Sequence, residues 1–338
     1  MQNNPKPSSV KAIGLLSGGL DSILAARVIK DMGIAARLVY FILPWLSINQ
    51  PRIQDLAAHL GLPVDLIPLD EQYLEMVKDP HHGYGTAINP CIDCKIHMLQ
   101  RAGEIMRRTG SHFVFTGEVL GQRPMSQNRQ SLDRIEKASG LFGRLVRPLS
   151  GQLLPPTIPE TEGLIDRAKL LSLSGRSRKD QLRLATEKGI TNFSQPAGGC
   201  LLTDKNFAKR LSDLFQHGGV SPQATAILQH GRHFRLDEHT KLILGRDEQE
   251  NDTLIALALP DDVIIQFTDE RGPTAILQST EPSLKQIAVT GGFIQHFSKS
   301  RDLPPRTVKY TPKHNPLSIC SCLIIKIDAE TLSAYKIA

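Results

Sequence analysis

The sequence predicts an α/β chain: an open parallel sheet with helices on both faces, followed by a small α+β domain. Three observations predict this fold class. Apolar runs typical of buried strands alternate with helical patterns through residues 12–188. A glycine turn at residues 17–19 joins the first strand to the first helix. Beyond Cys200, short apolar runs are separated by polar turns, which is typical of a small mixed domain.

The elements of the first domain follow from apolar periodicity and from residues that start or stop helices. Pro51 is favoured in a first helical turn, and Gly61 and Gly110 suit positions just after a helix. The predicted strands are 12–16, 36–41, 64–69, 113–115 and 145–149, and the predicted helices are 23–30, 51–60, 95–108, 164–171 and 177–188. Strands that alternate with helices in this way favour a parallel sheet, whose ligands lie beyond the carboxyl ends of the strands.

The second domain shows shorter strand patterns interrupted by one helical pattern. The predicted strands are 241–244, 263–267, 274–277 and 323–327, and the predicted helix is 283–289. Residues 204–214 form a helical pattern between the two parts. We therefore divide the chain into a first domain over 1–205, a helical connection over 206–230 and a second domain over 231–338.

Composition is that of a globular protein. The chain has 338 residues, which is long for a single core, and 40% of them are hydrophobic. No segment approaches the ~20 apolar residues of a membrane helix, and residues 1–6 show no apolar secretory signal. We therefore expect a cytoplasmic protein, in which the five cysteines are thiols or metal ligands rather than disulfides.

The net charge of +6 comes entirely from residues 1–200, because the remainder of the chain is balanced. Two stretches are strongly basic. The first lies between residues 123 and 147, and the second, between residues 297 and 313, also contains Phe297 and Tyr310. Basic side chains attract a polyanion, and aromatic rings can stack on its bases, so we expect RNA contacts on these stretches. The candidate RNA-binding residues are Arg123, Arg129, Arg147, Lys299, Arg301, Arg306 and Lys309.

The turn after the first strand reads Ser17-Gly18-Gly19-Leu20-Asp21-Ser22. Two glycines allow positive φ and a close approach of the backbone to a ligand. Free backbone amides at the start of a helix favour phosphate oxygens. The turn lacks the Gly-Lys-Ser/Thr of a Walker A loop and the third glycine of a dinucleotide fingerprint. It resembles instead the SGGxDS loop of the PP-loop ATP-pyrophosphatases, which split ATP into AMP and pyrophosphate.

Three cysteines stand in contexts typical of ligands. Cys91 and Cys94 form a C-x-x-C motif at the start of a helix, and Cys200 follows two glycines. Three thiolates suit a [4Fe–4S] cluster with one open iron, and a persulfide on Cys94 or Cys200, resolved by the other thiol, is an alternative. Cys320 and Cys322 are expected to be core thiols, although a zinc site formed with Cys91 and Cys94 is a further alternative.

The segment 114–127, VFTGEVLGQRPMSQ, closely resembles the TGExLGQxxSQ segment of the tRNA 4-thiouridine synthetases. The helix that Cys94 leads, the Val146-Arg147-Pro148-Leu149 element and the position of Cys200 resemble that family as well. The resemblance covers roughly residues 11–205. It implies an adenine-nucleotide alpha hydrolase-like (PP-loop) fold for the first domain. The family's N-terminal RNA-binding domains and its rhodanese-type extension have no counterpart in this sequence.

The resemblance implies ATP-dependent thiolation of a tRNA uridine. ATP and Mg²⁺ would be bound, AMP would be placed on a uracil carbonyl oxygen, and sulfur would then replace that oxygen. A cysteine desulfurase or inorganic sulfide would supply the sulfur. The implied ATP site consists of Ser17, Gly18, Gly19, Asp21, Ser22, Thr116, Gly117 and Gln122. Asp21, Cys94 and Cys200 would be catalytic, although Asp21 could instead simply cap its helix.

Residues 231–235 and 244–251 resemble the RNA-binding domain of NFACT proteins, which would supply the missing RNA module. Two other functions are compatible with the sequence. One is a PP-loop enzyme that acts on a small molecule, against which the basic stretches argue. The other is an RNA-binding protein with a degenerate nucleotide fold, against which the intact SGGLDS turn argues.

Overall fold

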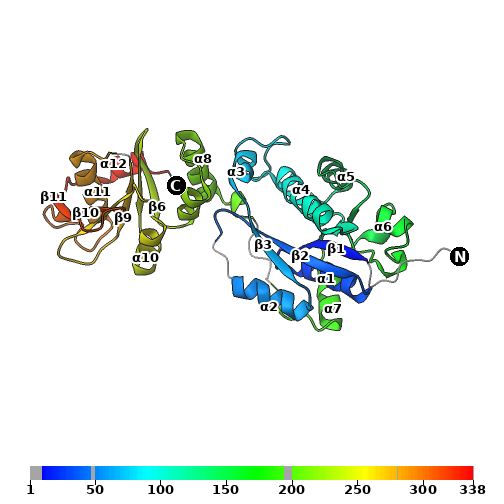
Figure 1. Ribbon diagram of the computed structural model, residues 1–338. Helices are drawn as coiled ribbons and strands as arrows, with labels where there is room; N and C mark the ends of the chain where they lie inside the picture. The colour runs from blue at the N-terminus through cyan, green and yellow to red at the C-terminus, as the bar shows by residue number, and fades with distance from the viewer. Residues whose placement is uncertain (1–9, 47–49, 194–199, 280, 338) are drawn as a thin grey trace. The chain divides into compact units, whose positions relative to one another are not determined.

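A computed structural model describes residues 10–46, 50–193, 200–279 and 281–337. The chain forms two compact units, Met1–Cys200 and Leu201–Ala338, each with its own sheet (Figure 1). Among the described residues, no helix combines the length and the apolar character that crossing a membrane requires. We describe the two units separately.

The first unit contains a five-stranded parallel sheet, which confirms the predicted fold class. Its strands are β1 (Lys11–Leu15), β2 (Ala35–Ile42), β3 (Val64–Pro68), β4 (Phe113–Phe115) and β5 (Leu145–Val146). Their order is β3-β2-β1-β4-β5, and every pairing is parallel. The central strands β1 and β4 are neighbours, so the segments that follow them emerge side by side at one edge.

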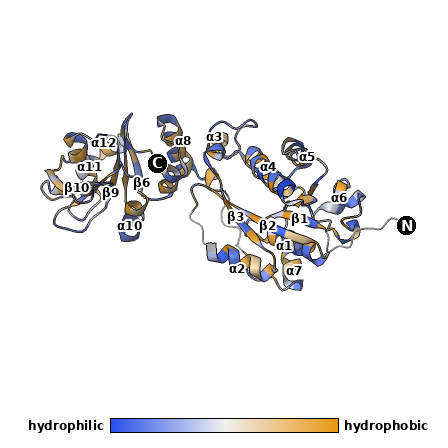
Figure 2. Cartoon of the chain, in the orientation of Figure 1, coloured by the Kyte–Doolittle hydropathy of each residue, from blue (hydrophilic) through white to orange (hydrophobic). Residues whose placement is uncertain are grey.

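Helices cover both faces of this sheet. The first unit contains α1 (Leu20–Asp31), α2 (Gln50–Leu60), α3 (Glu71–Lys78), α4 (Cys91–Thr109), α5 (Arg129–Ala138), α6 (Ile158–Thr161) and α7 (Lys179–Glu187). Figure 1 shows α1, α2 and α7 on one face and α3, α4 and α5 on the other, in agreement with the helix contacts. Helices α2 and α4 contain both hydrophilic and hydrophobic residues in Figure 2, as amphipathic helices do.

Two expectations in this unit are wrong. The predicted helix 164–171 is reduced to a 3-10 turn at Arg167–Lys169, because the amides of Leu171 and Leu173 donate to the carbonyls of Pro148 and Leu149 instead. The predicted strand 145–149 ends at Val146. Pro148 has no amide hydrogen with which to extend a ladder.

The second unit is built on an antiparallel sheet. Its strands are β6 (Arg232–Asp237), β7 (Thr240–Leu244), β8 (Val263–Phe267), β9 (Ala275–Gln278), β10 (Thr307–Pro312) and β11 (Cys320–Leu323), in the order β11-β10-β8-β9-β7-β6. Its helices are α8 (Lys205–His217), α9 (Pro222–Ala226), α10 (Glu248–Leu257), α11 (Leu284–His296) and α12 (Ala329–Tyr335). The buried rings of Phe234 and Phe293 lie 4.8 Å apart in the core between β6 and α11.

The predicted strand 323–327 and the predicted core thiols need correction here. Strand β11 spans Cys320–Leu323, because the amides of Ile324 and Ile325 donate to Arg306 and Ala288. Cys320 is exposed rather than buried, since β11 is an edge strand. Cys322, two residues along the strand, packs against the core of the unit.

The packing of β1 against β4 generates a prediction about stability. A Cβ atom on Gly14 would lie 2.2 Å from the ring carbon Cζ of Phe115 on the neighbouring strand. We expect Gly14→Ala to lower the free energy of unfolding of the first unit by about 1–3 kcal/mol, as overpacking does. Urea unfolding followed by the fluorescence of Trp45, the one tryptophan of the chain, measures this.

Phe115→Leu supplies the control, because it removes the ring that the new methyl group would meet. In that background, Gly14→Ala should cost less than about 1 kcal/mol. An equal cost in both backgrounds would mean that the ring is not what forbids a side chain at Gly14.

Candidate functional site

The glycine turn between β1 and α1 has the geometry of an anion-binding loop. Gly18 has a φ of 76°, which is accessible to glycine without strain. Gly19 is the N-cap of α1, and no side chain caps the helix. The Ser22 hydroxyl accepts from the Ser17 amide at 3.2 Å and donates to the Gly19 carbonyl at 2.8 Å. These bonds fix the shape of the turn and leave the positive end of the helix dipole facing the ligand side.

The segment after β4 lies directly against this turn. A Cβ on Gly117 would be 2.5 Å from the amide nitrogen of Ser22, so only glycine permits this approach. Gln122 reaches back to α1 and donates from Nε2 to Asp21 Oδ2 at 2.8 Å. Gln181 on α7 donates to Gln122 Oε1 at 3.2 Å and thereby fixes the orientation of the amide. The structure thus brings Asp21, Gly117 and Gln122 together.

The two carboxylate oxygens of Asp21 differ in their hydrogen bonding. Its Oδ2 accepts from Gln122, whereas its Oδ1 is buried and has no hydrogen-bond partner among the described residues. The carboxylate therefore does not cap α1, and that alternative is wrong. A buried carboxylate oxygen without a donor suits a hard cation such as Mg²⁺.

A buried ionic network supports the same edge of the sheet. The Glu118 carboxylate pairs with Lys95 on α4 and accepts from Arg147 Nε at 3.1 Å. Arg147 also donates to Glu136 Oε2 at 2.7 Å and to the Leu132 carbonyl at 3.1 Å. Burial alone would raise the pKa of Glu118, but the charges of Lys95 and Arg147 outweigh it and lower that pKa to about 2. Neither Lys95 nor Glu118 is among the site residues that the sequence predicts.

Arg147 was expected to contact RNA, and this expectation is wrong. Its side chain is only 4% exposed, and two carboxylates neutralise its guanidinium. The charges of Glu118 and Glu136 raise its pKa, although burial acts against them. A residue held in this way serves the interior of the first unit and has no surface to offer a phosphate.

The other candidate RNA-binding residues differ in their pairing. Arg123 and Arg129 are exposed, and Arg129 pairs with Asp133 at 2.9 Å. Lys299 and Arg301 are exposed in the second unit. Arg306 is already paired with Asp269 at 2.8 Å, and Lys309 lies on β10. The structure therefore separates free surface cations from cations that carboxylates hold.

The three candidate cysteines gather near Tyr73. Cys91 and Cys94 lie one turn apart at the start of α4, and the Tyr73 hydroxyl is hydrogen-bonded to Cys94 Sγ at 3.2 Å. Burial raises the pKa of the Cys94 thiol to about 12, opposed by the Tyr73 hydrogen bond and helped by the nearby Cys200 and Cys91 sulfurs. The same three sulfurs act on Tyr73, whose pKa burial raises well above its usual range.

Residues 194–199, which precede Cys200, lie outside the described residues. Within the described ranges, no group of three or more His, Cys, Asp or Glu side chains is arranged to hold a metal ion.

Two features of the thiol region gave no clear signal in the sequence. Tyr73 is fully buried on α3, where its ring contacts Trp45 at 5.9 Å and His97 at 5.5 Å between centroids. Asp93, between the two cysteines, accepts from the His82 amide at 2.9 Å and lies 2.8 Å from His82 Nδ1. These contacts anchor the segment before α4, so the thiols are presented from a fixed helix terminus.

Comparison with known proteins confirms the resemblance of both parts of the chain. Residues 8–152 match the family model of the thiamine biosynthesis protein ThiI, and residues 231–335 match that of the NFACT protein RNA binding domain.

The chain is 28% identical over 162 residues to a probable tRNA sulfurtransferase of Thermococcus kodakarensis, covering 47% of this chain and 40% of that one. It is 30% identical over 154 residues to a probable tRNA sulfurtransferase of Thermus thermophilus, covering 44% and 36%. The chain thus spans less than half the length of these curated relatives. A 4-thiouridine synthetase solved with RNA and ATP is 22% identical, with 55% of each chain covered and a TM-score of 0.36.

The ionic network predicts how stability depends on pH. The pKa of Glu118 is lowered in the folded state, so its contribution is fully present above the ordinary pKa of 4.5 and is lost as pH falls toward 2. We expect Glu118→Gln to lower the free energy of unfolding at pH 7 by on the order of a few kcal/mol. The deficit relative to the unsubstituted protein should shrink between pH 4.5 and 3.

Urea unfolding at several pH values, followed by Trp45 fluorescence, measures this difference. Glu162→Gln is the matched control, because Glu162 is exposed and lies 3.8 Å from Arg144. A deficit for Glu118→Gln that did not change with pH would exclude a charged Glu118 as the source of the stability.

Proposed function

We propose that this protein is an ATP-dependent tRNA thiolase, which adenylates a uracil carbonyl oxygen and then replaces it with sulfur. One observation carries the proposal: the thiols and the glycine turn are joined by an unbroken series of contacts. Cys94 precedes Lys95, Lys95 pairs with Glu118, and the adjoining Gly117 lies against the first turn of α1. The glycine turn would bind the phosphates of ATP, and the thiols would carry the sulfur. Their connection at one edge of the sheet suits a reaction that needs both adenylation and sulfur transfer.

In this proposal, ATP is the first substrate. The amides of the glycine turn and the Ser17 and Ser22 hydroxyls bind its phosphates, as the N-terminus of a helix can. Asp21 would hold Mg²⁺ through Oδ1, which has no hydrogen-bond partner among the described residues. Thr116 and Gln122 border the same space: Thr116 is held against Glu118 at 3.2 Å, and Gln122 against Asp21. The backbone amides of the turn, the serine hydroxyls and the bound cation would stabilise the negative charge that develops as pyrophosphate leaves.

The uracil carbonyl oxygen attacks the α-phosphorus of ATP, and pyrophosphate departs. The oxygen thereby becomes part of a good leaving group, AMP. The terminal sulfur of a persulfide on Cys94 or Cys200 then attacks the activated carbon, and AMP leaves. The second thiolate attacks the remaining cysteine sulfur, so that a disulfide forms and the thiouridine is released. An external reductant and a sulfur donor restore the starting state.

An iron–sulfur cluster is the alternative carrier of the sulfur. Cys91, Cys94 and Cys200 are the residues that would hold it, since all three sulfurs act electrostatically on Tyr73. Within the described ranges they are not arranged as a metal site, so binding a cluster would require them to move together. Such a cluster would present one iron without a protein ligand, where an additional sulfide could bind.

We propose that tRNA binds through the second unit as well as the first. The NFACT resemblance over residues 231–335 and the exposed Lys299 and Arg301 support a nucleic-acid surface there. The target uridine must leave its base stack to reach the nucleotide edge, at a cost of a few kcal/mol. Contacts to the tRNA body can offset that cost.

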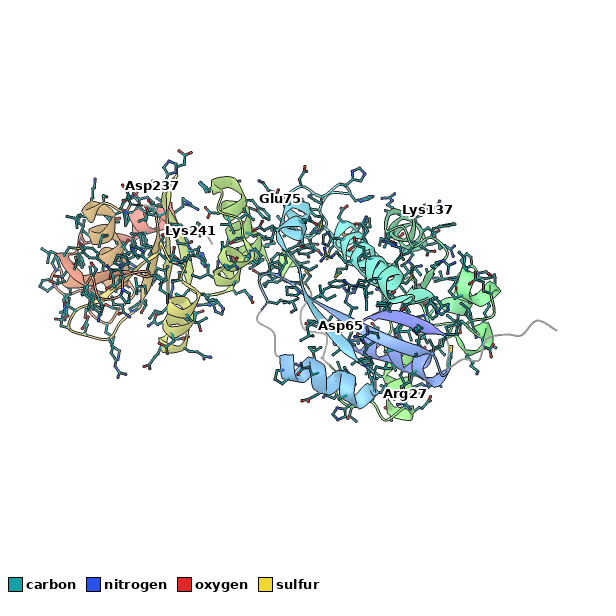
Figure 3. All side chains as sticks on the ribbon, in the orientation of Figure 1. Arg27, Asp65, Glu75, Lys137, Asp237 and Lys241 are labelled. Atoms are coloured by element: carbon teal, nitrogen blue, oxygen red, sulfur yellow. The ribbon has the colours of Figure 1, made fainter. Side chains whose placement is uncertain are left out.

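The nucleotide step is tested at Asp21. We expect Asp21→Asn to abolish tRNA-dependent ATP–pyrophosphate exchange, because it removes the charge that holds the cation while preserving the bond to Gln122. Asp31→Asn, at the other end of the same helix, is the control. Asp31 pairs with Arg27, which is labelled in Figure 3, at 2.7 Å and with Lys188, away from the glycine turn. Exchange by Asp21→Asn at the rate of Asp31→Asn would refute the assignment of the turn.

The sulfur step is tested at the cysteines. We expect Cys94→Ser and Cys200→Ser to lose thiolation of tRNA while retaining ATP–pyrophosphate exchange, because adenylation precedes the thiol chemistry. Cys320→Ser, which alters an exposed cysteine of the second unit, should behave as the unsubstituted protein. Thionucleoside analysis and pyrophosphate exchange are measured side by side. Thiolation by either of the first two variants would exclude that thiol from the reaction.

Iron analysis of anaerobically purified protein distinguishes the two sulfur carriers. Bound iron that is lost in Cys91→Ser supports the cluster. A Cys94–Cys200 disulfide trapped during turnover, without iron, supports the persulfide.

A further inference from the structure

Three arginines of the second unit come together where α8, β6 and the end of β7 meet. Arg232, the first residue of β6, lies opposite Leu244 in the β6–β7 ladder and donates to the Gly245 carbonyl at 3.4 Å. Arg246 follows that glycine. Arg210 on α8 donates to the Leu228 carbonyl at 2.9 Å, close to the start of β6. We call Arg210, Arg232 and Arg246 the arginine cluster.

Among the residues that the structure describes, Arg246 alone of the cluster forms a close ion pair. Its guanidinium contacts the Glu250 carboxylate, which also accepts from the amides of Gly231 at 3.2 Å and Arg246 at 3.0 Å. Both carboxylate oxygens of Glu250 therefore accept hydrogen bonds. The bond from the Arg246 guanidinium is the main reason that the pKa of Glu250 is lowered to about 2, and the two backbone amides act in the same direction. Within the described part of the chain, neither Arg210 nor Arg232 has a carboxylate within ion-pair distance, and each donates one hydrogen bond to a backbone carbonyl.

A guanidinium has five N–H donors, so Arg210 and Arg232 have donors left over. The Nε of Arg210 is buried and has no hydrogen-bond partner among the described residues. The guanidinium of Arg232 lies over the ring of Phe297, with its Cζ 4.5 Å from the ring centroid. Its fork is therefore orientated before any ligand arrives, which lowers the entropic cost of binding.

The cluster is electrostatically unfavourable as it stands. Burial, followed by the positive charge of Arg246, lowers the pKa of both Arg210 and Arg232. The carboxylates whose charge opposes this lowering of the pKa are Glu250 for both arginines and Asp204 for Arg210. Asp213 on α8 already pairs with Arg235 at 2.6 Å and, at 3.0 Å, with Lys241 on β7, which is labelled in Figure 3. An anion between the guanidiniums would supply both the missing acceptors and the missing charge.

We propose that the arginine cluster binds a phosphodiester group of the RNA backbone. The proposal rests on the function proposed above insofar as RNA is the partner. A planar fork of N–H donors matches two phosphate oxygens, and Arg210 and Arg232 both have donors for such a contact. The side chain of Arg246 is 49% exposed, so the cluster opens to solvent and is accessible to a polymer. Arg232 and Arg246 lie in the segments 231–235 and 244–251 that resemble the NFACT RNA-binding domain, whereas Arg210 gave no signal in the sequence.

The experiment measures binding of the full chain to unmodified tRNA over a series of salt concentrations. Arg210→Gln and Arg232→Gln should each weaken binding about tenfold and lower the slope of log affinity against log salt by about 0.7–0.9, as the loss of one phosphate contact does. Arg210→Lys and Arg232→Lys keep the charge but lose the fork, so the slope should persist while affinity falls less. Arg271→Gln is the control, because Arg271 is 96% exposed and lies in the same unit.

Thermal unfolding shows whether each variant is folded, and the lysine variants test the site even where a glutamine variant unfolds. Binding of tRNA by both folded glutamine variants with the affinity and salt slope of Arg271→Gln would overturn the proposal. Binding of inorganic phosphate that these variants lose, with tRNA binding unchanged, would also overturn it, because the site would then serve a free anion.

The proposed function fails separately. Unsubstituted protein that binds tRNA through the cluster but catalyses no ATP-dependent thiolation would refute the thiolase while supporting the phosphate site. If the unsubstituted protein and all the arginine variants thiolated tRNA equally well, the thiolase would be supported and the phosphate site refuted. Absence of tRNA binding by the unsubstituted protein would refute both.

Discussion

The buried pairing of Glu118 with Lys95 and Arg147 is the constraint on which the first unit depends. Three charged side chains from α4, the segment after β4 and the segment after β5 meet in the interior. Removing any one would leave the others charged and poorly solvated, which is far more costly than losing a surface pair. Because Lys95 follows Cys94 and Glu118 follows Gly117, this network also fixes the thiols relative to the glycine turn. The ion pairs that stabilise the fold thus also determine where Cys94 lies relative to the glycine turn.

The second unit is organised around cations as well, but in a different way. In the first unit, Arg147 is neutralised by two carboxylates and lies in the interior. In the second, Arg235 and Lys241 share Asp213, and Arg246 pairs with Glu250. Among the described residues, Arg210 and Arg232 have no carboxylate at ion-pair distance and donate to backbone carbonyls instead. The distinction between a structural and a ligand-binding arginine therefore lies in its partners rather than in its sequence neighbourhood.

Local patterns predicted the parallel sheet, the glycine turn and helices α1, α2, α4 and α7 to within a few residues, because strands, caps and glycine stops depend on residues close in sequence. They predicted no helix at α3 or α5. They failed where a distant partner decides. Arg147 stands in a basic stretch and was assigned to the surface, yet Glu118 and Glu136 draw it inside. Residues 164–171 have a helical pattern, yet the neighbouring backbone of Pro148 and Leu149 takes their amides. Tyr73 gave no signal, since its contact with Cys94 joins two separate helices.

The contact at Gly117 has a consequence for how the edge of the sheet tolerates change. It is a contact of main chain with main chain, so no rotamer can widen or narrow it. The separation between the two segments is then a fixed dimension of the scaffold, independent of side-chain identity elsewhere. The spacing between these two segments can therefore change only through a rearrangement of the backbone itself.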